Sequence, residues 1–153
     1  GEVAPVLHVE SWNGAPRIVG GREAGGLRTL LLFVSPTCPV CKTVLSIARA
    51  RVADERSGVR LLLASDGPRH EHEDFVREQA IDGAAYILSP DLGLAYQVGK
   101  LPYAVLLDGA GVIRAKGLVN TREHLDSLFE AEARGVASLQ EYMRRDREGR
   151  RVA

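Results

Sequence analysis

The only two cysteines of the sequence lie three positions apart, in the segment Cys38-Pro39-Val40-Cys41. Two thiols at this spacing can form a structural disulfide, belong to a metal site, or act as a dithiol that exchanges with other disulfides. A disulfide across two residues closes a very small loop, so it restricts the unfolded chain much less than a long cross-link does. The spacing therefore favours a reactive dithiol over a structural cross-link.

A zinc site is disfavoured by the other potential ligands in the sequence. Structural zinc sites usually take four cysteine or histidine ligands, and the chain has no second cysteine pair. The histidines, which show no spacing that completes such a site, are His8, His70, His72 and His124. His70 and His72 would diverge on a helix, and we interpret them as a solvated helix start. We expect no metal and no cofactor other than the redox-active disulfide itself.

The residues around the cysteines predict where the pair lies. Residues 28–34 predict a buried strand, and the alanine-, arginine- and leucine-rich residues 39–55 predict a helix. Cys38 then stands at the helix N-terminus, where free amides and the helix dipole stabilise a thiolate. Pro39 suits the first turn because it needs no amide partner there. We expect Cys38 to attack disulfides, and Cys41, one turn further along, to hold its proton more tightly.

Strand-like and helix-like stretches alternate along the chain, which predicts an α/β fold. The predicted strands are residues 6–10, 17–19, 28–34, 59–64, 86–88, 103–107 and 112–116, and the predicted helices are 39–55, 71–79, 121–133 and a stretch after Gly135, with a helical turn at Asp91. The turn at residues 108–111 predicts an antiparallel hairpin. We assign residues 1–145 to one domain and the charged residues 146–153 to a flexible tail.

The composition limits the possible classes of function. Twenty basic residues balance twenty acidic ones, so no bulk charge attracts nucleic acid or an acidic membrane surface, and we expect no nucleic-acid partner. Apolar runs such as residues 30–34 are far shorter than the about 20 residues of a membrane span. The chain begins without methionine or an apolar signal region, and we expect a segment upstream of it.

The order of strand, CxxC motif, helix and a later proline ahead of a hairpin resembles the thioredoxin family. In that family a cis-proline faces the CxxC pair, and Pro102 stands at the matching place. The resemblance implies a mixed sheet flanked by helices, with an N-terminal β-hairpin extension. It also implies a cis Leu101-Pro102 bond that turns the Leu101 backbone toward an extended peptide. Leu101, Pro102, Thr37 and Pro39 are the substrate-binding residues that it implies around Cys38.

Longer stretches are similar to a narrower family, the MauD-type methylamine utilisation accessory proteins. They are SPTCPVCK, LASDG, EHEDFVREQ and residues 92–143, which contain GLVNTREHLDSLFEA. That family is understood as periplasmic thioredoxin-like proteins, anchored at the N-terminus to the inner membrane, which help to mature the small subunit of methylamine dehydrogenase. The resemblance implies a thiol–disulfide oxidoreductase or isomerase that uses Cys38 and Cys41. It implies this subunit as the client, an upstream redox partner, and membrane contact only through a segment outside this chain.

Two departures from thioredoxin affect the mechanism that the resemblance implies. The buried acid that helps to deprotonate the second cysteine in thioredoxins would fall at Leu32, which carries no carboxylate. Asp66, just after a predicted strand, is the nearest candidate acceptor, although loop aspartates are more often solvated turn residues. Val40 stands where the strong periplasmic oxidant has a histidine, so extreme oxidising power is not indicated and the direction of exchange stays open.

Two alternative functions also stay open at this point. One is a redox-silent thioredoxin-fold chaperone or binding module for the same client. The other is a general periplasmic thiol reductant of the cytochrome c maturation type, which keeps the chemistry and changes the client.

Overall fold

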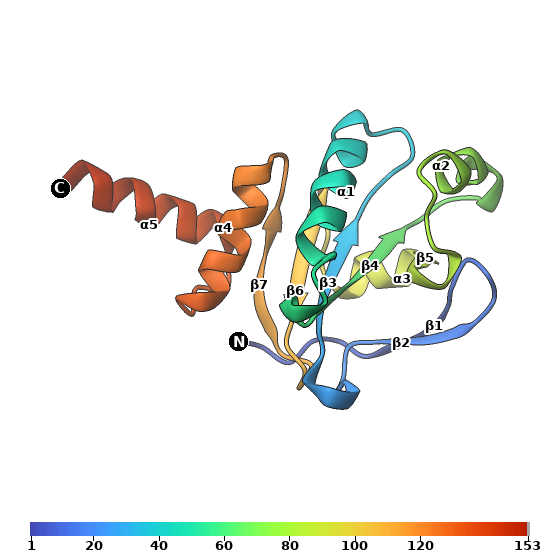
Figure 1. Cartoon of the computed structure of the whole chain (residues 1–153), viewed down its shortest axis with the longest axis horizontal. Helices are drawn as coiled ribbons and strands as arrows, with labels where there is room; N and C mark the ends of the chain where they lie inside the picture. Colours follow the sequence, from blue (N-terminus) through green and yellow to red (C-terminus); the bar gives the residue numbers. More distant parts are fainter. Residues whose placement is uncertain (153) are drawn as a thin grey trace.

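The computed structural model describes the backbone of residues 1–152 and the side chains of residues 1–54 and 56–149. The strands of its central sheet are β3 (Arg28–Phe33), β4 (Val59–Ser65), β5 (Tyr86–Leu88), β6 (Tyr103–Leu107) and β7 (Ile113–Leu118). They lie in the order β5-β4-β3-β6-β7 (Figure 1). β3, β4 and β5 are parallel, whereas β6 and β7 run antiparallel to their neighbours, so the sheet is mixed, as predicted.

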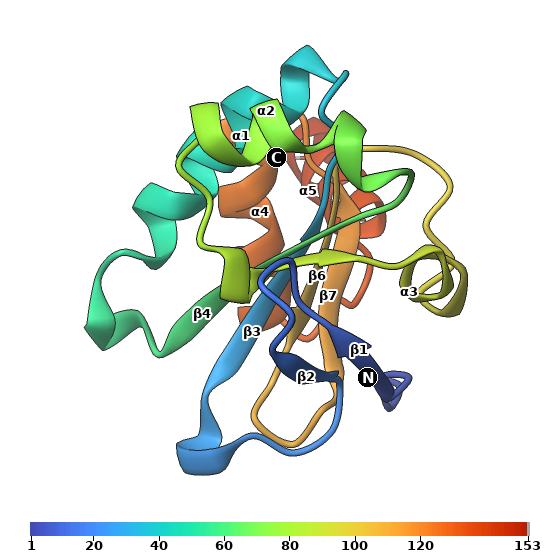
Figure 2. The same ribbon diagram turned by 90° about the vertical axis from the view of Figure 1, so that its right-hand side faces the viewer.

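Helices cover both faces of this sheet. They are α1 (Pro39–Val52), α2 (Glu73–Glu78), α3 (Pro90–Ala95), α4 (Arg122–Ala133) and α5 (Leu139–Val152), with short 3₁₀ turns η1 (Ala24–Gly26), η2 (Glu55–Ser57), η3 (Arg69–Glu71) and η4 (Gly83–Ala85). α1, α2 and α4 pack on one face, and α3 packs on the other (Figure 2). Among these helices, none combines the length and the apolar character that a membrane crossing requires.

The central strand β3 explains why both faces are covered. Side chains alternate between the two faces of a strand, and here the residues on both sides are apolar. Leu30 and Leu32 are fully buried in the core beneath α1 and α4. Leu31 and Phe33 are buried in the second core, beneath α3. The continuous apolar run of β3 is therefore explained by the burial of the strand on both faces.

An N-terminal hairpin borders the β5 edge of the sheet. Its strands are β1 (Leu7–Glu10) and β2 (Pro16–Val19), which pair antiparallel. Ser11 forms an isolated β-bridge with Ile87, and the Trp12 amide donates to the Tyr86 carbonyl at 2.7 Å. The predicted N-terminal β-hairpin extension is confirmed, and it protects an edge strand that would otherwise expose unpaired backbone groups.

Two predicted helix boundaries differ from the structure. The helix expected at residues 71–79 is divided into η3 and α2, with His72 between them at φ −104° and ψ −12°. The helical turn expected at Asp91 is α3, and its N-cap is Ser89, whose Oγ accepts from the Leu92 amide at 3.3 Å. Serine is a strong N-cap because its hydroxyl accepts from an amide of the first turn, and Pro90 fits the position that follows.

Residues 146–152 are helical, whereas the sequence predicts a flexible tail over residues 146–153, the last of which lies outside the described residues. They belong to α5, which projects from the body of the fold (Figure 1). Glu141 forms ion pairs with Arg144 and, at 3.0 Å, with Arg145, and pairs at these spacings favour helix. The division of the chain at residue 145 stays a prediction.

Candidate active site

Cys38 caps the N-terminus of α1, as predicted. Its backbone is extended (φ −98°, ψ 108°), and its Sγ accepts from the Cys41 amide at 3.2 Å. Pro39 follows at the first helical position, where no amide partner is required. Cys38 is half-buried, so its sulfur combines access from solvent with the stabilisation of negative charge that a helix N-terminus provides.

Cys41 lies one turn inward and is fully buried against the core. Burial raises the pKa of the Cys41 thiol to about 12, and the hydrogen bond with Cys38 adds to the rise, while the Ser35 backbone acts in the opposite direction. The structure thus bears out the expectation that Cys41 holds its proton tightly. Both sulfurs are free thiols here, so a half-exposed thiol stands directly above a buried, protonated one.

The loop before β6 lies beside the cysteine motif. The Leu101-Pro102 bond is cis, as predicted from the family resemblance. Phe33 at the end of β3 pairs with Tyr103, so Pro102 lies at the end of the sheet where the chain leaves β3 for the motif. Pro102 is buried, whereas Leu101 is 40% exposed. An extended peptide could therefore reach Leu101 and Cys38 along the same edge.

The other two residues assigned to substrate binding, Thr37 and Pro39, flank Cys38 and are both exposed. The Thr37 hydroxyl lies 3.1 Å from the Ser35 hydroxyl, which holds the turn before Cys38. The predicted site residues thus gather at the C-terminal end of β3 and at the loop before β6. Their roles in catalysis and in substrate binding stay predictions.

A cavity of about 230 Å³ opens next to this edge, on the α3 side of the sheet. Its lining residues come from the ends of β3, β4 and β5 and from the segment around α3, and they are Phe33, Val34, Ala64, Ser65, Asp66, Ser89, Gly93, Val98, Gly99 and Leu101. Because Leu101 belongs both to this lining and to the loop beside the motif, a peptide bound at that loop could place a side chain in the cavity.

The Asp66 carboxylate, which the sequence suggests as a proton acceptor for Cys41, is not among the groups that act on that thiol. The Asp66 side chain is exposed, and the groups that influence the Cys41 pKa are Cys38 and the Ser35 backbone. Leu32, at the place of the missing acid, is fully buried. Neither position supplies a carboxylate to the buried cysteine.

His72 is the residue that sequence reasoning placed wrongly. The sequence predicts that it belongs to a solvated helix start, but only 1% of its surface is exposed. His70 is exposed, so the two rings diverge as expected. Phe75, an apolar residue three positions further on, is the sequence signal that could have indicated the burial of His72, because this spacing places two side chains on one helical face. Phe75 is buried in the structure. Among the side chains of residues 1–54 and 56–149, no three His, Cys, Asp or Glu groups gather to hold a metal ion.

Two bacterial relatives match nearly the whole chain. The "Methylamine utilization protein MauD" of Paracoccus denitrificans is 46% identical over 143 residues, which cover 94% of this chain and 70% of the relative. The protein of the same name from Methylobacillus flagellatus is 44% identical over 144 residues, which cover 94% and 69%. The chain belongs to the MauD family. No model of a known protein family matches the chain.

Solved structures establish the fold of this MauD-family chain. It is similar to a putative thiol:disulfide interchange protein DsbE from Chlorobium tepidum, with a TM-score of 0.70 and 15% identity over 86% of this chain and 96% of the other. StoA from Bacillus subtilis has a TM-score of 0.66 and 21% identity over 84% of this chain and 99% of its own. The thioredoxin-like fold predicted for the chain is therefore confirmed.

Proposed function

We propose that this MauD-family chain is a thiol–disulfide oxidoreductase in which Cys38 attacks and Cys41 resolves. The observation that carries the proposal is the pairing of a half-exposed Cys38 at a helix N-terminus with a fully buried Cys41 one turn behind it. A thiolate at the first position can reach the disulfide of another protein. The second thiol is shielded from that protein and lies beside the bond to be broken.

The exchange proceeds in two balanced steps. The Cys38 thiolate attacks one sulfur of a client disulfide, so a Cys38–client bond forms and the other client sulfur leaves as a thiolate. Cys41 then loses its proton and attacks Cys38, which forms the Cys38–Cys41 disulfide and releases the second client sulfur. The client gains two electrons and the dithiol loses them. The same steps in reverse transfer a disulfide to a client, so one site serves reduction, oxidation or isomerisation.

The client in this proposal is the small subunit of methylamine dehydrogenase, a disulfide-rich protein. The names of the relatives support a role in methylamine utilisation. We propose that the chain meets this client in the periplasm, where a segment outside this sequence tethers it to the inner membrane. Val40 and Leu101, each 40% exposed, offer apolar contacts beside Cys38 for an extended segment of the client.

The client can be identified by trapping it on Cys38. When the full-length protein and the small subunit are co-expressed in a periplasm and quenched with acid, Cys41→Ser should accumulate a covalent adduct, because serine cannot resolve the mixed disulfide. Cys38→Ser is the matched control and should give none. Non-reducing electrophoresis and mass spectrometry would identify the adduct. An adduct through Cys41 in the Cys38→Ser variant would reverse the assigned roles, and normal subunit maturation without either cysteine would favour a binding module.

A further inference from the structure

The resolving step leaves one chemical requirement unmet by the residues described so far. Cys41 must lose its proton to attack the mixed disulfide, yet its pKa of about 12 keeps it protonated near neutral pH. Leu32 offers no carboxylate, and the Asp66 side chain is exposed. A buried thiol that reacts at neutral pH needs a nearby group to receive its proton.

A buried histidine–tyrosine pair lies in the same core as Cys41. His72 Nδ1 is 2.7 Å from the Tyr86 hydroxyl, and His72 Nε2 is 2.7 Å from the Asp66 carbonyl oxygen. A carbonyl oxygen can only accept, so Nε2 carries the proton in the neutral ring and Nδ1 is the acceptor. The Tyr86 hydroxyl therefore donates to His72 Nδ1. The imidazole is held with its free basic nitrogen already aimed at a proton donor.

The sheet register brings Tyr86 toward the cysteines. Leu32 pairs with Leu63, and Leu63 pairs with Tyr86, so these three residues form one row across neighbouring strands. All three belong to the buried cluster that contains Cys41. Tyr86 thus lies on the same row as Leu32, the position of the missing acid, and two strands away from it. The side chain of Tyr86 is longer than that of Leu32.

The surroundings of Tyr86 disfavour its ionisation, and Cys41 is one of the groups that contribute. Burial raises the pKa of Tyr86 to about 12; a hydrogen bond from Ser65 opposes the rise, and the negative charge of a Cys41 thiolate adds to it. Trp12 and Phe75 pack on the Tyr86 ring with centroids 5.9 Å and 6.1 Å away, so water is excluded from the phenol. A phenol in this setting can pass a proton on but does not stay ionised.

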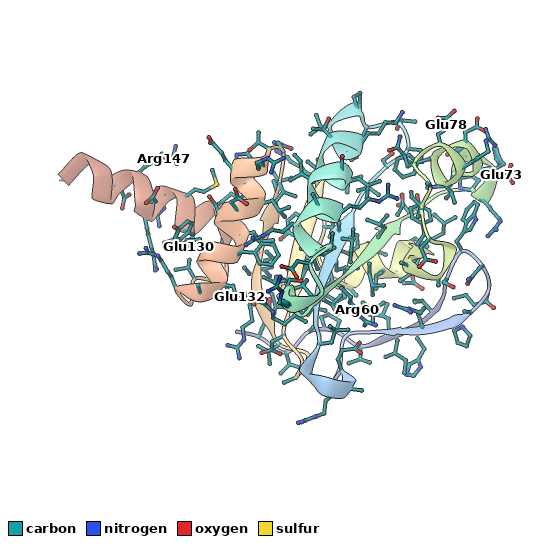
Figure 3. All side chains as sticks on the ribbon, viewed as in Figure 1. Arg60, Glu73, Glu78, Glu130, Glu132 and Arg147 are labelled. Atoms are coloured by element: carbon teal, nitrogen blue, oxygen red, sulfur yellow. The ribbon has the colours of Figure 1, made fainter. Side chains whose placement is uncertain are left out.

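The charged groups around His72 do not lie between its ring and Tyr86. A Cβ added to Gly67 would lie 3.5 Å from Glu71 Oε2 and 3.6 Å from His72 Nε2, so the Glu71 carboxylate stands on the Nε2 side of the ring, whereas Tyr86 contacts Nδ1. Arg69 is directed away, over the Trp12 ring, at 3.6 Å from its centroid. Glu73 and Glu78 of α2 point outward (Figure 3) and are exposed.

We propose that the Tyr86–His72 pair receives the proton of Cys41 in the resolving step, in place of the buried carboxylate of thioredoxins. The inference rests on the proposed function. As the Cys41 sulfur forms its bond to Cys38 and the client thiolate departs, the thiol proton passes to the Tyr86 oxygen, and the original phenol proton passes to His72 Nδ1. The phenol stays neutral throughout. The imidazolium keeps its Nε2 proton on the Asp66 carbonyl, and the reverse reaction returns the proton to Cys41.

The test is a single-turnover reaction of the reduced chain with dithiobis(nitrobenzoate), an aromatic disulfide whose released thiolate absorbs visible light. The first release reports attack by Cys38, and the second reports resolution by Cys41. Tyr86→Phe keeps the ring and removes the relay, so we expect the second release to slow by about tenfold or more at neutral pH while the first is unchanged. The rate of this second release in Tyr86→Phe should then rise in proportion to hydroxide, whereas the wild-type rate should depend less steeply on pH.

Tyr96→Phe is the matched control. Tyr96 is also buried with a pKa raised to about 12, but it lies in the core beneath α3 and donates to the Pro5 carbonyl at 2.8 Å. The Tyr96→Phe variant should show the second release at the wild-type rate and with the wild-type pH profile. Equal second-release rates and profiles in Tyr86→Phe and Tyr96→Phe would overturn the relay alone. Loss of the first release in the wild-type chain would overturn the proposed function, and the relay with it.

A second measurement does not depend on activity. Nitrogen NMR of the reduced chain at mildly alkaline pH should show His72 neutral with its proton on Nε2, because the Asp66 carbonyl requires a donor there. Asp66 supplies this contact through its backbone, so Asp66→Asn should leave the tautomer unchanged. A proton on Nδ1 of His72 would mean that the phenol cannot donate to it, and the relay would be wrong.

Discussion

Cys38→Ser is expected to lose disulfide exchange by at least about a thousandfold, because a hydroxyl at the helix N-terminus is not ionised near neutral pH and is a far weaker nucleophile than a thiolate. The assay is catalytic reduction of a soluble protein disulfide, with a dithiol reductant to recycle the chain. The loss should appear in the first bond-forming step, since Cys38 is the half-exposed sulfur.

Cys41→Ser is the matched comparison for this loss. It keeps the attacking thiol, so it should form one equivalent of mixed disulfide at the wild-type rate and then stop. Serine replaces a thiol of similar shape at both positions, and circular dichroism would verify that each variant is folded. Exchange by Cys38→Ser at a rate close to that of the wild type would contradict the assignment of Cys38 as the nucleophile.

Leu32→Asp is expected to lower the free energy of unfolding by about 3 kcal/mol or more at neutral pH, since it places a carboxylate among apolar neighbours. Leu32 is fully buried, and its partners across the sheet are Leu63 and Ala104. Burial raises the carboxyl pKa in the folded state above its unfolded value of about 4. Stability is therefore greatest below the unfolded value and falls as the pH rises through the folded value.

Leu32→Asn separates the charge from the loss of packing. Both substitutions remove the same apolar contacts, but asparagine has no titration, so its deficit should not depend on pH between mildly acidic and neutral conditions. Denaturant unfolding at several pH values measures both. If Leu32→Asp and Leu32→Asn lost the same stability at every pH, the row that contains Leu32 would accommodate a carboxylate, and the case for a substitute acceptor would weaken.

The sequence predicted the fold well because its strongest signals are local. The apolar run of β3 leads directly into the cysteine motif and the helix, so periodicity and helix-start chemistry placed Cys38 without knowledge of any distant contact. The turn at Asp108 predicted the hairpin of β6 and β7 for the same reason. The family resemblance added what these rules cannot give, namely the cis bond at Pro102.

The buried polar groups could not be predicted in this way. His72 lies in a charged segment of the sequence, which predicts exposure. Its burial depends on a tertiary contact with Tyr86 of β5, which no local sequence pattern indicates. Asp66 was considered for its carboxylate, yet its carbonyl is the group that contacts His72. Whether the backbone or the side chain of a residue makes a hydrogen bond depends on tertiary packing. Residue type alone does not predict it.

The most direct test of the central claim is equilibration of the chain in glutathione buffers of graded redox ratio, followed by acid quenching, thiol labelling and mass spectrometry. The account predicts a transition from two labelled thiols to none, in a chain lighter by two hydrogen atoms, with any minor glutathione adduct on Cys38. A chain in which both cysteines stay labelled at every ratio would contradict it and would leave a binding module as the better description.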